Sequence, residues 1–194
     1  MPFLDLVTKR FSVRRFLDTP IDAGAIQRCI DAARLAPSAC NSQPWHFIIV
    51  DDPELRARVA AETTTPLMPL NHFVADAPVI IVALSEKGNL TSRFGSVVRQ
   101  REFRWIDLGI AVEHICLQAA EEGIGTCIIG WFNEKPIRKI LDIPHDKSIG
   151  LLIALGHTDR EAPADRTRKD IDAIRSFNRY GQISHDRSEE GTGE

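Results

Sequence analysis

A short polar segment between two prolines carries side chains that are well suited to binding a ligand. Residues 37–44 read Pro-Ser-Ala-Cys-Asn-Ser-Gln-Pro, and they lie between a helical pattern and an apolar β-type run over residues 47–50. Pro37 cannot continue the preceding helix, because proline has no backbone N–H and clashes with the preceding turn. The hydrogen-bonding side chains of this segment are Ser38, Asn41, Ser42 and Gln43. We expect them to form a polar wall of a ligand site where the chain enters the core.

A cluster of arginines near the N-terminus has the residue types of a phosphate site. Residues 10–16 read Arg-Phe-Ser-Val-Arg-Arg-Phe and follow a short helical pattern. Guanidinium groups match the geometry of phosphate oxygens, and a serine hydroxyl can donate a further hydrogen bond. A solvated run of charge is the alternative interpretation. The sequence contains a second basic group at residues 166–169, towards its other end.

Three glycines, Gly123, Gly125 and Gly130, form a third segment of interest. They follow a helical pattern and precede an apolar run, whereas a dinucleotide fingerprint requires strand, glycine turn and then helix. No Gly-Lys-Ser/Thr sequence is present, so a Walker A loop is also excluded. Two interpretations stay open. The glycines either end a helix before a buried strand, or expose a strand edge to a flat heterocycle.

In this order and spacing, the three segments resemble the FMN-dependent nitroreductase family, in its smaller and poorly characterised branch. The resemblance rests on Arg10-x-Ser12-x-Arg14, on Ala36-Pro37-Ser38 with Asn41 and Gln43-Pro44-Trp45, and on the run from Glu122 to Gly130. It extends over most of the chain. It implies an α+β fold in which helices flank a central mixed sheet, with a long buried core helix. It also implies a homodimer with flavin at the subunit interface.

The resemblance further implies which residues bind the FMN. The phosphate would be held by both ends of the chain, and residues 37–43 would line the flavin of the opposite subunit. Residues 128–130 would lie near flavin N5 and O4. The full set is Arg10, Phe11, Ser12, Arg14, Pro37, Ser38, Ala39, Asn41, Gln43, Asn71, Ile128, Ile129, Gly130, Arg166 and Arg168. Phe11 stands where many family members carry a polar residue, which weakens one phosphate contact.

The implied activity is that of an FMN-dependent NAD(P)H oxidoreductase. NADH or NADPH would give a hydride to flavin N5 and leave, and a small electrophilic acceptor such as a nitroaromatic or a quinone would take it in a ping-pong cycle. No catalytic side chain is then required, because the flavin carries the redox chemistry. A flavin-dependent dehalogenase or dehydrogenase on the same fold is a second interpretation, which a lid within residues 62–73 or 86–101 would decide. The sequence is also compatible with a non-catalytic flavin-binding or storage protein, and with an α+β binding domain whose arginines are surface charge.

The composition of the chain limits its domain organisation, its partners and its location. A chain of 194 residues with a net charge of -3 predicts a single domain over residues 1–183, followed by a disordered polar tail at 184–194. The charge gives no reason to expect nucleic acid or an anionic membrane as a partner. No run spans a bilayer and no signal-peptide pattern is visible, so we expect a cytoplasmic protein. The four cysteines have no metal-ligand spacing. Cys29 and Cys116 are expected to be structural, whereas the roles of Cys40 and Cys127 stay open.

Apolar spacing predicts the elements that position these segments. Helical periodicity covers residues 2–9, 22–36, 52–62, 97–122 and 133–141, and apolar β-type runs cover residues 46–50, 79–84, 124–131 and 149–155. Asp22, Asp52 and Asn133 are predicted N-caps, and Gly123 suits the position after a helix where φ is positive. The helix over 97–122 is apolar on nearly every side, which predicts the core helix. Beyond residue 163, Ile171, Ile174 and Phe177 predict a docked arm.

Overall fold

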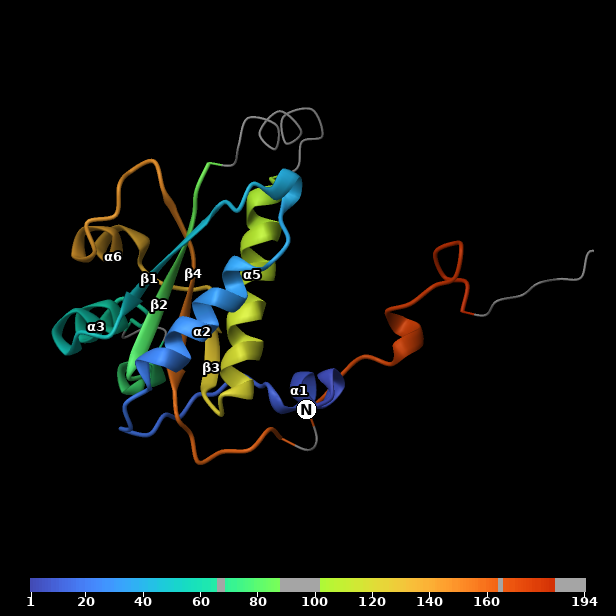
Figure 1. Ribbon diagram of the computed structural model, residues 1–194, viewed down its shortest axis with the longest axis horizontal. Coiled ribbons are helices and arrows are strands. Elements are labelled where there is room, and N and C mark those ends of the chain that lie inside the picture. Colours follow the sequence, from blue (N-terminus) through green and yellow to red (C-terminus); the bar gives the residue numbers. More distant parts are fainter. Residues whose placement is uncertain (66–68, 88–101, 164–165, 184–194) are drawn as a thin grey trace, which may run out of the picture. The chain divides into compact units, whose positions relative to one another are not determined.

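The computed structural model of the chain describes residues 1–65, 69–87, 102–163 and 166–183. Internal contacts group Met1–Ala162 into one compact unit and Pro163–Glu194 into a second, and each is described by itself. The predicted single domain over residues 1–183 stays a prediction, and the predicted tail lies outside the described residues. The elements are α1 (Phe3–Lys9), α2 (Ala23–Arg34), η1 (Ala39–Asn41), β1 (Trp45–Val50), α3 (Pro53–Ala61), η2 (His72–Asp76), β2 (Val79–Ser85), α5 (Phe103–Glu121), β3 (Gly125–Ile129), α6 (Glu134–Ile140), β4 (Ser148–Gly156) and η3 (Ile171–Ala173) (Figure 1).

A sheet with the strand order β1-β2-β4-β3 forms the centre of the first unit. Neighbouring strands pair antiparallel, with Ile48 opposite Val82 and Ile128 opposite Ile153. Every residue of β2 is buried, as expected for an inner strand covered on both faces. The α+β class is confirmed. The parallel pairing expected of a mixed sheet is, within the described residues, a single bridge between Ser12 and Thr126.

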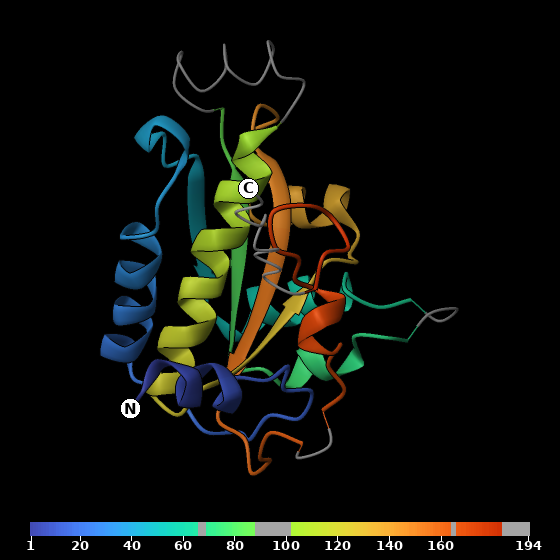
Figure 2. The ribbon, with the colours of Figure 1, turned by 90° about the vertical axis from the view of Figure 1, so that its right-hand side faces the viewer.

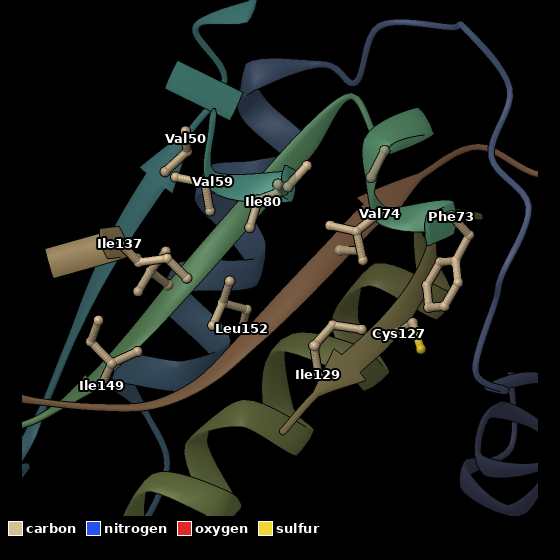
Figure 3. Close-up of a cluster of buried hydrophobic side chains, with 14 of the residues drawn as sticks. Val50, Val59, Phe73, Val74, Ile80, Cys127, Ile129, Ile137, Ile149 and Leu152 are labelled. Carbon is tan, nitrogen blue, oxygen red and sulfur yellow. The ribbon is translucent and has the colours of Figure 1, made fainter. Parts of the chain in front are cut away.

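Side chains of β2 alternate between two apolar layers, because successive residues of a strand point to opposite faces. Val79, Ile81 and Ala83 pack with residues of α2 and α5 on one face. Ile80 and Val82 pack on the other face with side chains from α3, η2 and α6. The labelled members of this second layer in Figure 3 are Val50, Val59, Phe73, Val74, Ile80, Cys127, Ile129, Ile137, Ile149 and Leu152.

Helix ends follow the predicted chemistry in most places. Asp22 Oδ2 accepts a hydrogen bond from Ala25 N at 2.9 Å, and Asp52 Oδ1 accepts one from Leu55 N at 2.8 Å. Gly123 has a φ of 74°, which confirms its predicted position after α5. Asn133 stands at the N-cap of α6, but its side chain makes no capping bond. It donates instead to Glu62 Oε2, so the prediction of a side-chain cap is wrong there.

The core helix α5 packs one face against the sheet and leaves part of another face exposed. Leu108, Ala111 and Ile115 are buried in the layer that α5 shares with α2 and β2. Ile106 is 56% exposed and Trp105 is 37% exposed. Residues 97–101 of the predicted helix lie outside the described residues. None of the helices in the described part of the chain has the length and apolar character needed to cross a membrane.

The cysteines differ in exposure. Cys29 and Cys116 are buried, as predicted for structural thiols, and burial raises the pKa of the first to about 11 and of the second to about 12. Cys127 is also buried, and desolvation raises the pKa of its thiol. Cys40 is exposed and lies in η1. A raised pKa opposes thiolate formation, so the three buried cysteines do not have the character of nucleophiles.

Two glycines of the sheet allow the arginine segment to approach it closely. A Cβ on Gly125 would lie 2.6 Å from Val13 Cγ2, and a Cβ on Gly156 would lie 2.7 Å from Phe16 Cδ1. These glycines are opposite one another in the pairing of β3 with β4. Val13 and Phe16 therefore pack onto a part of the sheet that has no side chains.

We expect Gly125→Ala to lower the free energy of unfolding by about 1–3 kcal/mol, because the new methyl group overlaps Val13. The cost should shrink in a Val13→Ala background, which removes the Cγ2 atom that the methyl group would meet. Denaturant unfolding of the wild type, both single variants and the double variant measures this coupling. Strictly additive costs would show that the contact with Val13 is not the cause.

Candidate functional site

β3 is an edge strand of the sheet. Beyond Thr126, no described strand pairs with the backbone groups on its outer side. β3 is the last strand of the sheet, and Val13 N donates to the Thr126 carbonyl oxygen at 2.9 Å. That carbonyl therefore points away from β4. Because backbone groups of alternate residues point to the same edge of a strand, Ile128 also directs its N–H and C=O outward. Gly130 comes directly after β3 and is the next residue in this alternation. The backbone groups of Ile129 point toward β4, and its side chain is buried.

The arginine segment lies beside this edge, and its three cations have different partners. Arg10 Nε is 3.3 Å from Glu113 Oε1, and Arg15 Nη2 is 3.7 Å from Asp159 Oδ2. Arg14 is exposed and has no carboxylate partner among the described residues. Burial raises the pKa of Cys127, whereas the positive charges of Arg14 and Arg10 lower it. Both arginines therefore lie near β3. Arg14 is therefore the cation of this segment that is best placed to meet an anion.

Ser12 and Phe11 differ in surroundings. Ser12 is exposed next to Arg14, and its backbone forms the bridge to Thr126. Phe11 is partly buried and packs against the apolar layer that contains Val13. The ring thus contributes packing, and its predicted contact with the cofactor stays a prediction.

A hydrogen-bond network holds the segment that follows β3. Asn71 Nδ2 donates to the Trp131 carbonyl oxygen at 3.1 Å. Asn133 N donates to the Glu62 carbonyl oxygen at 2.8 Å, and Asn133 Nδ2 donates to Glu62 Oε2 at 3.1 Å. With its nitrogen bonded to Trp131, the Asn71 amide keeps Oδ1 as an acceptor next to the segment that begins at Gly130. This arrangement favours a ligand that donates an N–H.

The polar segment between the two prolines folds into a strained turn. Cys40, Asn41 and Gln43 have φ values of 53°, 49° and 45°. Non-glycine residues pay roughly 1–2 kcal/mol each for this left-handed geometry. Two bonds inside the turn oppose the cost: Ser38 Oγ accepts from Gln43 N at 2.9 Å, and Gln43 Nε2 donates to Asn41 Oδ1 at 3.0 Å. Strain of this kind concentrates at ligand sites.

The structure brings the predicted residues together at two places within the first unit. The residues around the β3 edge are Arg10, Phe11, Ser12, Arg14, Asn71, Ile128, Ile129 and Gly130. The turn carries Pro37, Ser38, Ala39, Asn41 and Gln43, and it leads into β1, the strand at the other edge of the sheet. Figure 2 shows η1 and β1 on the opposite side of the sheet from β3. One chain therefore does not join the two groups into one site.

The predicted roles of the site residues stay predictions, and this includes the second unit and the two candidate lids. Arg166 and Arg168 belong to the second unit, where Arg168 Nη1 donates to the Thr167 carbonyl oxygen. Their contribution to a phosphate site stays a prediction. The candidate lid at residues 62–73 is described except for residues 66–68. Of the other candidate lid, at residues 86–101, residues 88–101 lie outside the described residues.

A cavity of about 620 Å³ opens next to the arginine segment. It lies between α1, the C-terminal end of α5 and the chain after β4. Its lining is Asp5, Thr8, Lys9, Arg10, Phe11, Val13, Ala120, Gly123, Ile124, Gly125, Thr126, Thr158, Arg160, Glu161 and Ala162. Only Arg10 and Phe11 of the predicted cofactor residues line it. Among its cations, Arg10 is paired with Glu113 and Arg160 with Asp159, and residues 128–130 do not line it, so we place the candidate site at the β3 edge instead.

Sequence reasoning did not single out two residues that support these groups. Asp107 is buried on α5 and accepts a hydrogen bond from Ala39 N. Glu62 ends α3 and binds Asn133. Asp107 had a visible signal, since it is a carboxylate inside an otherwise apolar helix. Glu62 had none, because an acidic residue at a helix end is ordinary.

Comparisons with known proteins identify the family of the chain. Residues 7–66 and 60–157 match the family model described as the nitroreductase family. An oxygen-insensitive NADPH nitroreductase of Helicobacter pylori is 28% identical over 208 residues, which is 90% of this chain and 99% of that protein.

Solved structures show the same likeness. A nitroreductase family protein of Clostridium novyi has a TM-score of 0.70 and 33% identity, over 94% of this chain and 96% of that one. An FMN-dependent nitroreductase of Clostridium difficile has a TM-score of 0.75 and 26% identity, over 92% and 100%. With the family model matched over more than half of its length, the chain belongs to the nitroreductase family.

Proposed function

We propose that this chain is an FMN-dependent NAD(P)H oxidoreductase that reduces a small electrophilic acceptor, such as a nitroaromatic or a quinone. The observation that carries the proposal is the open edge of β3, with an unmatched arginine at one end and an oriented asparagine amide at the other. Bound FMN would supply the redox chemistry in a ping-pong cycle, by accepting a hydride at N5 from NADH or NADPH and passing it on.

The residues at the edge fit the groups of a flavin mononucleotide. The backbone N–H groups of Ile128 and Gly130 suit the acceptor atoms along one side of an isoalloxazine ring. The Asn71 Oδ1 atom suits the ring's imide N–H, since Trp131 fixes the orientation of the amide. Arg14 and the exposed Ser12 hydroxyl suit a phosphate. These groups bind and orient the cofactor, and none has to transfer a proton.

A second copy of the chain completes the site in this proposal. The turn at residues 37–43 lies at the far edge of the sheet from β3, so it can reach a β3 edge only on a partner subunit. Exposed apolar side chains on α1 and α5 support a homodimer: Phe3 is 65% exposed, Leu4 75% and Ile106 56%. A cytoplasmic location stays a prediction from sequence.

The direct test of the cofactor is the visible absorption spectrum of the purified protein under nitrogen. We expect flavin bands that lose intensity when NADH or NADPH is added, because the bound cofactor accepts the hydride. Flavin bands that persist would favour the storage protein or another electron donor. A colourless protein that FMN cannot reconstitute would overturn the proposal.

Replacing Arg14 tests the phosphate contact. We expect Arg14→Ala to weaken FMN binding by roughly tenfold to a hundredfold, because a charge-assisted hydrogen bond is worth about 1.5–3 kcal/mol. Arg15→Ala is the matched control, since Arg15 is adjacent, exposed and paired with Asp159. Fluorescence titration of flavin-free protein with FMN measures both affinities. Equal affinities of the two variants would place the phosphate elsewhere.

A further inference from the structure

Two buried polar atoms lack a hydrogen-bond partner, and one of them belongs to a residue that contacts the turn. Within the described residues, the buried side-chain oxygens and nitrogens that lack a partner are Ser85 Oγ and Asp107 Oδ2. Ser85 is opposite Trp45 in the sheet, and the next residue, Glu86, donates its N–H to the Pro44 carbonyl oxygen. Asp107 lies beneath Ala39. Unsatisfied buried groups are rare in folded proteins, so the one that belongs to Asp107, next to the turn, requires a physical reason.

Asp107 connects the strained turn to the core. Its Oδ1 atom accepts a hydrogen bond from Ala39 N at 3.1 Å. Two further side-chain bonds of the turn, Ser38 with Gln43 and Gln43 with Asn41, are internal to it. Internal bonds set the shape of a turn but not its orientation on the protein. The bond from Ala39 N to the Asp107 carboxylate is a contact between the turn and α5, and it therefore helps to orient the turn on that helix.

Asp107 is poorly explained by stability alone. The carboxylate is 4% exposed in an apolar layer, and such a group is costly to bury unless its oxygens are hydrogen-bonded. One oxygen has a single backbone donor and the other has none among the described residues. Ala39, which it bonds, is followed by Cys40 and Asn41, both in left-handed geometry. A buried carboxylate with an unsatisfied oxygen that holds a strained backbone segment is typical of a functional site.

We propose that Asp107 is a positioning residue, which holds residues 38–43 in the conformation that contacts the flavin. The identity of the ligand in this inference rests on the proposed function. The role of Asp107 in the geometry of the turn does not. By fixing Ala39 N, Asp107 presents the following left-handed residues, including Asn41, in one orientation. Asp107 itself need not touch the cofactor.

Hydrogen–deuterium exchange of flavin-free protein tests the geometry without any cofactor. We expect Asp107→Ala to speed exchange in the peptide covering residues 37–44 by at least about tenfold, because the turn loses its anchor. Asp107→Asn keeps an oxygen acceptor of the same shape, so exchange should return to within about threefold of the wild type. Unchanged exchange in Asp107→Ala, or an Asn variant that behaves like the Ala variant, would overturn the inference. Asp107→Ser, too short to reach Ala39 N, takes the place of the Ala variant if that protein does not fold.

FMN titration of the same variants tests the consequence for the ligand. We expect Asp107→Ala to raise the FMN dissociation constant about tenfold and to alter the visible circular dichroism of bound flavin, with both restored in Asp107→Asn. Ala119→Gly is the control, because it weakens the same helix far from the turn. A similar loss of affinity in Ala119→Gly would mean that general destabilisation is responsible. If the wild type binds no FMN, the proposed function fails, and the exchange experiment still decides whether Asp107 positions the turn.

Discussion

The close contact between the arginine segment and the strands β3 and β4 is the constraint on which the candidate site depends. Gly125 and Gly156 leave room for Val13 and Phe16, and the bond from Val13 N to Thr126 fixes the register of the segment against β3. With Val13 buried, the flanking residues Ser12 and Arg14 are on the outer side. The position of the unmatched cation therefore follows from the packing of its neighbours. A shift of one residue would bury the arginine and expose the valine.

Local features of this fold could be predicted from the sequence, and features that join distant segments could not. Asp22, Asp52 and Gly123 act within one turn of their helices, so residue type and spacing identify them. Of the two interpretations of the glycines, the helix end is confirmed at Gly123, whereas a strand edge that is exposed to a flat heterocycle stays a prediction. The prediction for Asn133 is wrong for the opposite reason. Its side chain prefers Glu62, which is 71 residues away and which no local pattern connects to it.

The candidate site shows the same division between local features, which the sequence predicts, and contacts between distant segments, which it does not. The three segments can be found because their residue types are unusual at their spacing. The anchor under the turn cannot, because Asp107 and Ala39 are 68 residues apart. Local patterns also contain no strand order, and that order decides which predicted residues share a site. β1 and β3 are the two edges of the sheet, so residues 37–43 and residues 128–130 face away from one another within a chain. This separation gives a physical reason to expect that function requires two copies.

Charge around the β3 edge is arranged so that a weakly acidic protein can still attract an anion. The whole chain has a net charge of -3, and carboxylates pair with Arg10 and Arg15. Arg14 keeps its charge unmatched by any described carboxylate and close to the edge. Burial raises the pKa of Cys127, so the nearby thiol stays neutral and adds no negative charge there. Long-range attraction is thus weak, and in the proposed site specificity for a phosphate-bearing ligand would come from one exposed guanidinium beside backbone donors. Such an arrangement discriminates by geometry more than by total charge, because at physiological salt charges further away than about 8 Å are largely screened.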